Sequence, residues 1–324
     1  MDRIRTVARP ALRPDITMPV IRRRTGRGIG RLAVGGLLIG LVAAITACGT
    51  GSTPSPATGL RVVATTTVFA DLVRAIGGNR VSVDSIIPAG AGPEDYEPKP
   101  DDARRLADAG LIVKNGVGLD DFLDRLLDAN SRAKPLLTLG AGIPTIAIDG
   151  EPNPHFWLDP TLVRDRYVPA IAAELAALDP AGTSTYDANA AAYARQLDDL
   201  DTALKAKIET IPPTSRKLVT FHDAFPYFAR HFGFELVGVL LHNVGQEPTG
   251  SDLADLVSRV KAAGVKAVFG EAQFNPKLAQ TLANEAGVGK VVTTLYNDAL
   301  GPAPADTYLG MMSWNVDQIV DALR

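Results

Sequence analysis

Two histidines lie where a parallel α/β fold usually places its ligand-binding side chains. His155 is in a loop just before a predicted helix, because Asp159 and Pro160 fit the N-cap and first positions of that helix. His222 directly follows a predicted strand over residues 217–221. In open α/β sheets, ligands bind outside the carboxyl ends of the strands, so both imidazoles are candidate metal ligands.

Carboxylates follow other predicted strands in the same way. Glu94, Glu271 and Asp298 each lie beyond the end of a strand. Imidazole together with carboxylate suits Mn²⁺, Fe²⁺ or Zn²⁺. The single cysteine, Cys48, leaves no thiolate set for copper(I) or an iron–sulfur cluster. The candidate ligands are about 60 to 76 residues apart, so a site exists only if the fold brings their loops together.

The other two histidines have local roles in this interpretation. His231 lies on an aromatic helix face, Phe228-Ala-Arg-His-Phe232, and is predicted to be structural. His242 follows a strand and is expected to be a loop residue. Two roles stay open for Glu271, which either lies behind a metal ligand or caps the start of a helix.

The candidate ligands must be positioned by strands that alternate with helices. Strands are predicted over 60–67, 81–87, 111–115, 145–148, 217–221, 235–241, 267–269 and 291–296. Helices are predicted over 69–76, 100–109, 120–127, 252–263 and 276–286. This alternation predicts an α/β fold with mainly parallel sheets flanked by helices and built from right-handed crossovers.

One long helix separates the two runs of strands. Apolar residues at close to 3.6-residue spacing predict a helix over about 184–210, and Pro212-Pro213 stops it. Such a helix spans about 40 Å, enough to run along two lobes and restrict their movement. We therefore expect an N-terminal α/β lobe at 60–180, a linking backbone helix at 181–211 and a C-terminal α/β lobe at 212–324.

The first 47 residues are typical of a bacterial lipoprotein signal peptide. They contain nine arginines, and an uncharged stretch over 32–47 ends in small residues before Cys48, the expected lipidation site. That stretch is too short for a comfortable membrane span. Residues 48–59 are polar and predict a flexible tether, so the protein should be anchored to the membrane by lipid. Met18 is an alternative start.

The charge of the remaining chain argues against one class of partner. Without residues 1–47 it has 24 Lys and Arg against 34 Asp and Glu, a net charge of −10. A strongly acidic chain is unsuited to nucleic acid and compatible with attracting cations.

Six segments occur in a characteristic order along the chain. They are Ile87–Pro98, Leu111–Gly118, Asn153–Pro160, Thr220–Phe225, Glu271–Asn275 and Leu295–Gly301. Together they resemble the metal-specific solute-binding receptors of bacterial zinc and manganese ABC importers, over nearly the whole chain from Val62 to Leu323. The resemblance implies two α/β lobes joined by a long helix, with the metal held between them by one residue from each of four loops.

By this resemblance, His155, His222 and Asp298 match the second, third and fourth ligands of the family. The first family ligand is usually a histidine after a proline, and here Glu94 stands at that place. If Glu94 binds, two imidazoles and two carboxylates favour Mn²⁺ or Fe²⁺ without excluding Zn²⁺. If it does not, a water could fill its place. The His-rich loop of many zinc-specific members is absent between Gly118 and Pro154.

The expected function is therefore capture of Mn²⁺ or Zn²⁺, or Fe²⁺, outside the cytoplasm and its delivery to an ABC permease, without enzymatic chemistry. We expect a monomer. Two alternatives stay open: a metal-dependent hydrolase with Glu271 as general base, and a binding protein for a small organic solute or for adhesion. The second would need an aromatic or arginine-lined pocket, and only 6% of the residues are aromatic.

Overall fold

The structure is a computed structural model that describes residues 59–324 except 95, 128, 149 and 242–247. The described residues all belong to one compact unit. The signal peptide predicted for residues 1–47, Cys48, nearly all of the tether and His242 lie outside the described residues. Within the described part, no helix has the length and apolar character needed to cross a membrane.

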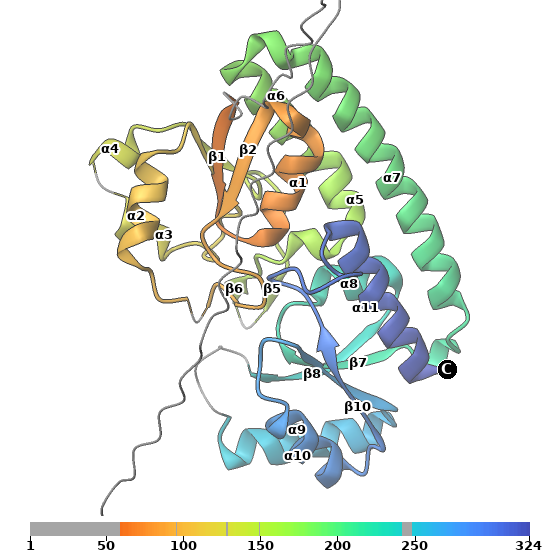
Figure 1. The fold of residues 1–324 in the computed structure, drawn as a ribbon. Coiled ribbons are helices and arrows are strands. Elements are labelled where there is room, and N and C mark those ends of the chain that lie inside the picture. Colours follow the sequence, from red (N-terminus) through yellow and green to blue (C-terminus); the bar gives the residue numbers. More distant parts are fainter. Residues whose placement is uncertain (1–58, 95, 128, 149, 242–247) are drawn as a thin grey trace, which may run out of the picture. The chain divides into compact units, whose positions relative to one another are not determined.

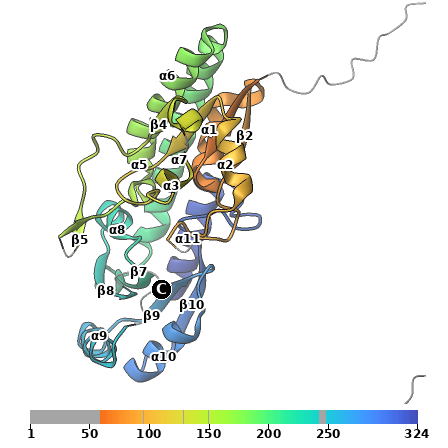
Figure 2. The ribbon, with the colours of Figure 1, turned by 90° about the vertical axis from the view of Figure 1, so that its left-hand side faces the viewer.

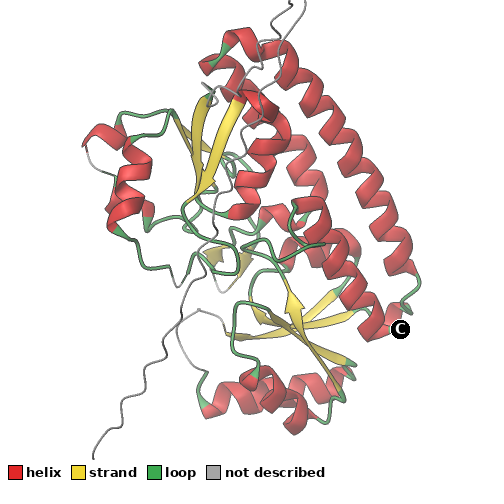
Figure 3. Cartoon of the chain, in the orientation of Figure 1, coloured by secondary structure: helices red, strands yellow, loops and turns green. Residues whose placement is uncertain are grey.

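Strands and helices alternate along the described chain (Figure 3). The strands are β1 Leu60–Ala64, β2 Val81–Ser85, β3 Leu111–Lys114, β4 Leu136–Thr138, β5 Ala147–Ile148, β6 Glu151–Pro152, β7 Lys217–His222, β8 Glu235–Leu241, β9 Ala267–Glu271 and β10 Lys290–Leu295. The helices are α1 Thr67–Gly77, α2 Pro100–Ala107, α3 Leu123–Leu126, α4 Ala129–Arg132, α5 Pro160–Leu162, α6 Val168–Leu178, α7 Thr183–Glu209, α8 Pro226–Phe232, α9 Gly250–Ala263, α10 Lys277–Ala286 and α11 Tyr308–Leu323.

The N-terminal half contains a four-stranded parallel sheet in the order β2-β1-β3-β4. Strands β1 and β3 are central and mostly buried, as their runs of Val, Ile and Leu require in a sheet covered on both faces. Helix α1 connects β1 to β2 and packs on α6 and α7. The carboxyl ends of β1, β2 and β3 therefore all face the same edge of the sheet.

The C-terminal half has two parallel strand pairs, β7 with β8 and β9 with β10. Strand β7 lies beside β9, and all five residues of β9 are buried. Figure 2 shows α9 and α10 next to these strands, where α9 packs on β8 and α10 on β9 and β10. Together with the N-terminal sheet, this arrangement confirms the predicted fold class of mainly parallel sheets flanked by helices.

Helix α7 is the long helix that the sequence predicts between the halves. It has 27 residues, so it spans about 40 Å. Its buried residues recur at helical spacing: Tyr186, Tyr193, Leu197, Leu200, Leu204 and Ile208. In Figure 1 it runs past α6 and α1 and then along α11, consistent with contacts from Asn189 to the Ile76 carbonyl (2.9 Å) and from Lys207 to Asp317. The lobe boundaries 60–180, 181–211 and 212–324 stay predictions.

The structure differs from the predicted elements at several places, and β4, the fourth strand of the N-terminal sheet, is absent from the predicted strands. The helix expected over 120–127 is reduced to α3, because Asp120 instead accepts a hydrogen bond from the Gly116 N–H at 2.6 Å and shapes a loop. The strand expected over 145–148 is only the short β5, which pairs antiparallel with β6 outside the main sheets. Helix α11 is absent from the sequence-based prediction, although its buried residues recur at helical spacing.

Candidate metal centre

The fold brings Glu94, His155, His222 and Asp298 together. Glu94 lies in the loop between β2 and α2, and His155 comes just before a 3₁₀ turn over Phe156–Leu158. His222 is the last residue of β7, and Asp298 lies in the loop after β10. One ligand atom of each residue can be chosen so that all four atoms lie within 4.8 Å of one another. The four residues predicted as ligands from the sequence therefore lie close together, although His222 ends a strand and does not lie in a loop.

His155 is held with one ring nitrogen facing the other three side chains. The Asn153 carboxamide oxygen accepts a hydrogen bond from the His155 backbone N–H at 3.1 Å and lies 3.2 Å from Nδ1. Nδ1 therefore carries the proton in a neutral ring, which leaves the lone pair on Nε2. Asp159 caps α5 by accepting from the Thr161 N–H at 2.9 Å, which confirms the predicted helix start after the His155 loop.

His222 lies between carboxylates on both sides of its ring. Nδ1 is 3.6 Å from a carboxylate oxygen of Glu271. Nε2 is 3.6 Å from Asp298 Oδ2 and 3.8 Å from Glu94 Oε1. The Asn297 carboxamide, 3.3 Å away, can donate to Nε2. Glu271, fully buried at the end of β9, is placed to hold the Nδ1 proton and so to direct Nε2 toward the other candidate ligands.

Asp298 is fully buried, and its two carboxylate oxygens have different surroundings. Oδ2 accepts a hydrogen bond from the Gln273 carboxamide at 2.8 Å. Oδ1 has no hydrogen-bond partner in the described part of the chain and lies 3.4 Å from His155 Nε2. Gln273 is not among the residues predicted from the sequence, since a glutamine two residues after Glu271 has no distinctive spacing.

Glu94 is the most exposed member of the group. Its side chain keeps 25% of its surface exposed, whereas those of His155, His222 and Asp298 keep 5%, 4% and 0%. Oε1 lies 3.8 Å from Nε2 of each histidine. Gly92 leaves room for the Glu94 carboxylate beside the two histidines. A Cβ at residue 92 would lie 3.2 Å from Glu94 Oε2 and 3.5 Å from the Gln273 side-chain nitrogen. Glu94 therefore closes the solvent side of the group.

The proximity of carboxylates and imidazoles shifts their pKa values in opposite directions. Burial lowers the pKa of His222, but Glu271, Asp298 and Glu94 outweigh it and raise that pKa to about 10. Burial also lowers the pKa of His155, and contacts with Asp298 and Glu94 produce a net upward shift. Burial raises the pKa of Glu94, yet the two histidines lower it to about 2. The pKa of Glu271 is raised by its burial. Without a metal ion, His222 therefore holds a second proton at neutral pH.

Several buried polar atoms in this group lack hydrogen-bond partners among the described residues. They are His155 Nε2, His222 Nδ1, Asp298 Oδ1 and both carboxylate oxygens of Glu271. An unpartnered buried polar atom costs about 1–3 kcal/mol, so a cluster of them needs a functional reason. Nε2 of His155 and Oδ1 of Asp298 face the space shared with Glu94 and His222. A divalent cation there would satisfy these atoms and offset the carboxylate charge.

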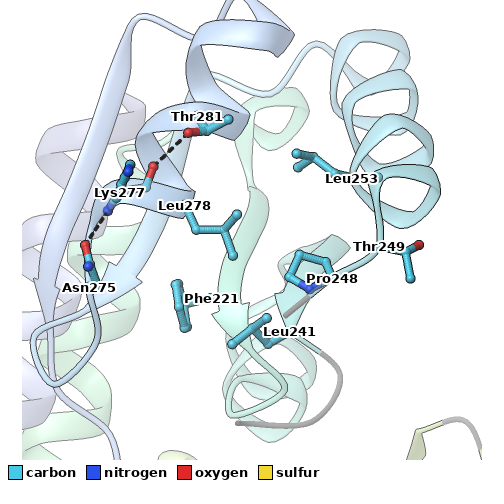
Figure 4. A pocket seen from close by; sticks show the side chains of 10 residues that line it. Phe221, Leu241, Pro248, Thr249, Leu253, Asn275, Lys277, Leu278 and Thr281 are labelled. Atoms are coloured by element: carbon cyan, nitrogen blue, oxygen red, sulfur yellow. Dashed lines mark hydrogen bonds between the residues drawn. The ribbon is translucent and has the colours of Figure 1, made fainter. Parts of the chain in front are cut away.

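A pocket of about 290 Å³ lies beside this group and gives access to it. Glu94, His155 and His222 line the pocket together with Val117 and Pro152. A larger pocket of about 460 Å³ lies on the other side of β7, where Phe221 and Leu278 form part of an apolar lining (Figure 4). The described lining of this second pocket has no imidazole or carboxylate, so it offers no comparable metal ligands.

His231 lies apart from the candidate centre. Its Nδ1 is 3.3 Å from Asp159 and its Nε2 is 2.5 Å from Asp201, so it connects α8 with the α5 cap and with α7. Both ring nitrogens are engaged by carboxylates within the protein. This arrangement agrees with the structural role predicted for His231.

The chain is similar to several known metal-binding and metal-transport proteins. The family model described as "ZnuA: Zinc-uptake complex component A periplasmic" matches residues 62–322. The manganese-binding lipoprotein MntA of Halalkalibacterium halodurans is 33% identical over 291 residues, covering 87% of this chain and 96% of the relative. The iron ABC transporter substrate-binding lipoprotein MtsA of Streptococcus pyogenes is 29% identical over 295 residues, covering 86% and 94%. The structure of the periplasmic zinc-binding protein TroA from Treponema pallidum matches with a TM-score of 0.76 and 29% identity, over 82% of this chain and 99% of TroA.

Proposed function

Because the chain belongs to the ZnuA family of periplasmic zinc-uptake components, we propose that it captures one divalent transition metal ion with Glu94, His155, His222 and Asp298 and delivers it to an ABC permease. It is an extracytoplasmic substrate-binding component of a metal importer, and members of this family are not enzymes. The observation that carries the proposed site is the convergence of four ligand atoms within 4.8 Å of one another.

The mechanism requires binding and release without bond-making in a substrate. A metal ion that reaches the pocket exchanges most of its water for two imidazole nitrogens and two carboxylate groups. Glu94 and Asp298 offset the two positive charges, and the neutral imidazoles contribute nitrogen donors. Glu271 does not bind the metal in this proposal, and its carboxylate, 3.6 Å from His222 Nδ1, acts on that ring through its charge.

The donor set favours Mn²⁺ or Fe²⁺ without excluding Zn²⁺. Two carboxylates make the set harder and more anionic than three histidines and one carboxylate. The relatives named above include a manganese-binding, an iron-transporter and a zinc-binding protein, so the family accommodates all three metals. Glu94 is the residue at which this chain departs from the usual family pattern, and it is the natural place to test metal preference.

Replacement Glu94→His is expected to raise the affinity for Zn²⁺ relative to Mn²⁺ by about tenfold, because it exchanges a hard anionic oxygen for an imidazole nitrogen. The fold should tolerate the change, since this side chain is partly exposed. Competitive titration of Zn²⁺ and Mn²⁺ measures the ratio of the two affinities. Glu97→His in the same loop is the matched control, because residue 97 is exposed and outside the group. An unchanged ratio in Glu94→His would mean that residue 94 does not bind the metal.

The test of the function itself is elemental analysis, with competitive metal titration, of protein purified without a metal-binding affinity tag. The proposal requires one transition metal ion per chain and reversible binding of Mn²⁺, Fe²⁺ or Zn²⁺. Protein that binds none of these ions would contradict it. The two alternatives raised by the sequence, a metal-dependent hydrolase and a receptor for organic solutes, gain no support from relatives named as metal-transporter lipoproteins.

We further propose that Cys48 anchors the protein through lipid and that the protein acts as a monomer. Curated relatives are named lipoproteins, and Cys48 follows small residues at the end of an uncharged stretch. Cys48→Ser is expected to move the protein from the membrane fraction to the soluble fraction, since the lipid would have no thiol to attach to. Immunoblots of both fractions, with Ser52→Ala as control, measure this. Retention of the Cys48→Ser protein in the membrane fraction would exclude Cys48 as the anchor.

A further inference from the structure

Gln273 makes two hydrogen bonds at the candidate metal centre. It lies in the loop between β9 and α10, two residues after Glu271. Its carboxamide nitrogen donates to Asp298 Oδ2 at 2.8 Å and to Asn297 Oδ1 at 3.1 Å. A primary amide has two N–H donors, so these two acceptors use both of them. Because a carboxylate only accepts, the orientation of the Gln273 amide is fixed.

The neighbouring Asn297 is itself held firmly, so Gln273 cannot easily move away from Asp298. The Asn297 backbone carbonyl accepts a hydrogen bond from the Trp157 indole N–H at 2.7 Å, and Trp157 is fully buried. The Asn297 side-chain nitrogen lies 3.3 Å from His222 Nε2. Asn297 therefore links the loop of His155, the end of β7 and the loop of Asp298. The hydrogen bond from Gln273 to Asn297 Oδ1 fixes the Gln273 side chain to this well-held residue.

The consequence is an asymmetric Asp298 carboxylate. Oδ2 accepts the Gln273 N–H and lies 3.6 Å from His222 Nε2, whereas buried Oδ1 accepts no hydrogen bond among the described residues and lies 3.4 Å from His155 Nε2. A hydrogen-bonded carboxylate oxygen is a weaker metal donor than a free one. Asp298 is therefore prepared to bind through one oxygen. If Glu94 also binds through one oxygen, the donors total four, the number that Zn²⁺ prefers, while Mn²⁺ favours more oxygen donors.

We propose that Gln273 is a specificity-determining positioning residue, which restricts Asp298 to one metal-bound oxygen and thereby favours Zn²⁺ over Mn²⁺. This inference rests on the proposed function, because it assigns a role at the same metal site. It also opposes the effect of Glu94, whose carboxylate favours Mn²⁺. The two residues together set a metal preference that neither one determines alone.

The test replaces Gln273 with leucine, which keeps the approximate size and removes both donors. Freed from its hydrogen bond, Oδ2 should join Oδ1 on the metal. The Zn²⁺-to-Mn²⁺ affinity ratio is expected to fall by about tenfold, the lower end of the effects of groups that orient metal ligands. Co²⁺ serves as a spectroscopic probe, because four-coordinate Co²⁺ absorbs visible light much more strongly than five- or six-coordinate Co²⁺. The Co²⁺ band of Gln273→Leu should weaken relative to that of the unchanged protein.

Two further variants make the outcome decisive. Gln280→Leu, on the exposed face of α10, removes a glutamine bonded to Asn284 at 3.0 Å and should change neither the ratio nor the spectrum. Gln273→Met also lacks N–H donors and replaces the leucine variant if that protein does not fold. A Zn²⁺-to-Mn²⁺ ratio within twofold of the original, with an unchanged Co²⁺ spectrum, would overturn the role of Gln273. If the unchanged protein binds none of Mn²⁺, Fe²⁺ and Zn²⁺, that result would instead overturn the proposed function.

Discussion

Replacement of His155 or His222 with alanine is expected to weaken Mn²⁺ and Zn²⁺ binding by more than about a hundredfold, beyond the range found for groups that only orient ligands. Each variant removes one of two nitrogen donors and leaves one imidazole with two carboxylates. The remaining buried carboxylate, Asp298, would face a site with too few donors to replace the water of the ion. Competition against a chromophoric chelator measures the loss for each metal.

The control for this pair of variants is His231→Ala. His231 is also a largely buried histidine between carboxylates, but it lies apart from the metal group. Its removal should lower stability while leaving the metal affinity within a few-fold of the original. Circular dichroism and thermal unfolding establish that all three variants are folded. Unchanged affinity in both His155→Ala and His222→Ala would refute the proposed site.

Metal affinity is expected to fall by about ten- to a hundredfold for each pH unit between pH 7 and pH 5. In the metal-free protein, carboxylates raise the pKa of His222 to about 10 and raise that of His155. His222 therefore carries a proton that a metal ion must displace, and the upward shift of the His155 pKa favours a proton on that ring as well. Each displaced proton makes binding tenfold weaker per unit of falling pH. Glu94, with a pKa lowered to about 2, stays ionised over this range and adds no further proton.

Calorimetry in two buffers of different ionisation enthalpy counts these protons directly. Between about one and two protons should leave per metal ion bound at pH 7. His222→Ala, if it retains measurable binding, should release about one proton fewer. Metal binding that releases no protons, with an affinity constant across pH 5 to 7, would show that the imidazoles are not the donors. Such a result would leave the fold and the family membership unaffected.

The sequence by itself determined the elements and the candidate residues on them. The period-2 and period-3.6 patterns predicted most of the main strands and the long helix, since a strand buried in a parallel sheet or a helix face must show that pattern. Strand β8 was predicted with its observed bounds, and α7 differed from the predicted 184–210 by one residue at each end. His155, His222 and Asp298 were found because the ends of parallel strands are where such folds bind ligands.

Only the tertiary structure decided how these side chains meet. Glu94, His155, His222 and Asp298 are about 60 to 76 residues apart, and no local pattern specifies a distance between loops of that separation. The packing of the two halves brings their ligand atoms within 4.8 Å of one another. It also places Glu271 behind His222.

The hydrogen bonds of Gln273 and Asn297 could likewise not be predicted from the sequence, although both residues lie in segments that carry the family resemblance. The difference between Oδ1 and Oδ2 of Asp298 depends on one amide 2.8 Å from one oxygen. Hydrogen-bond geometry of that kind depends on tenths of an ångström, which packing sets and residue type does not. The sequence thus supplied the donors of a metal site. The packed fold determined the distances between them, which of their lone pairs accept no hydrogen bond, and how exposed each donor is to solvent.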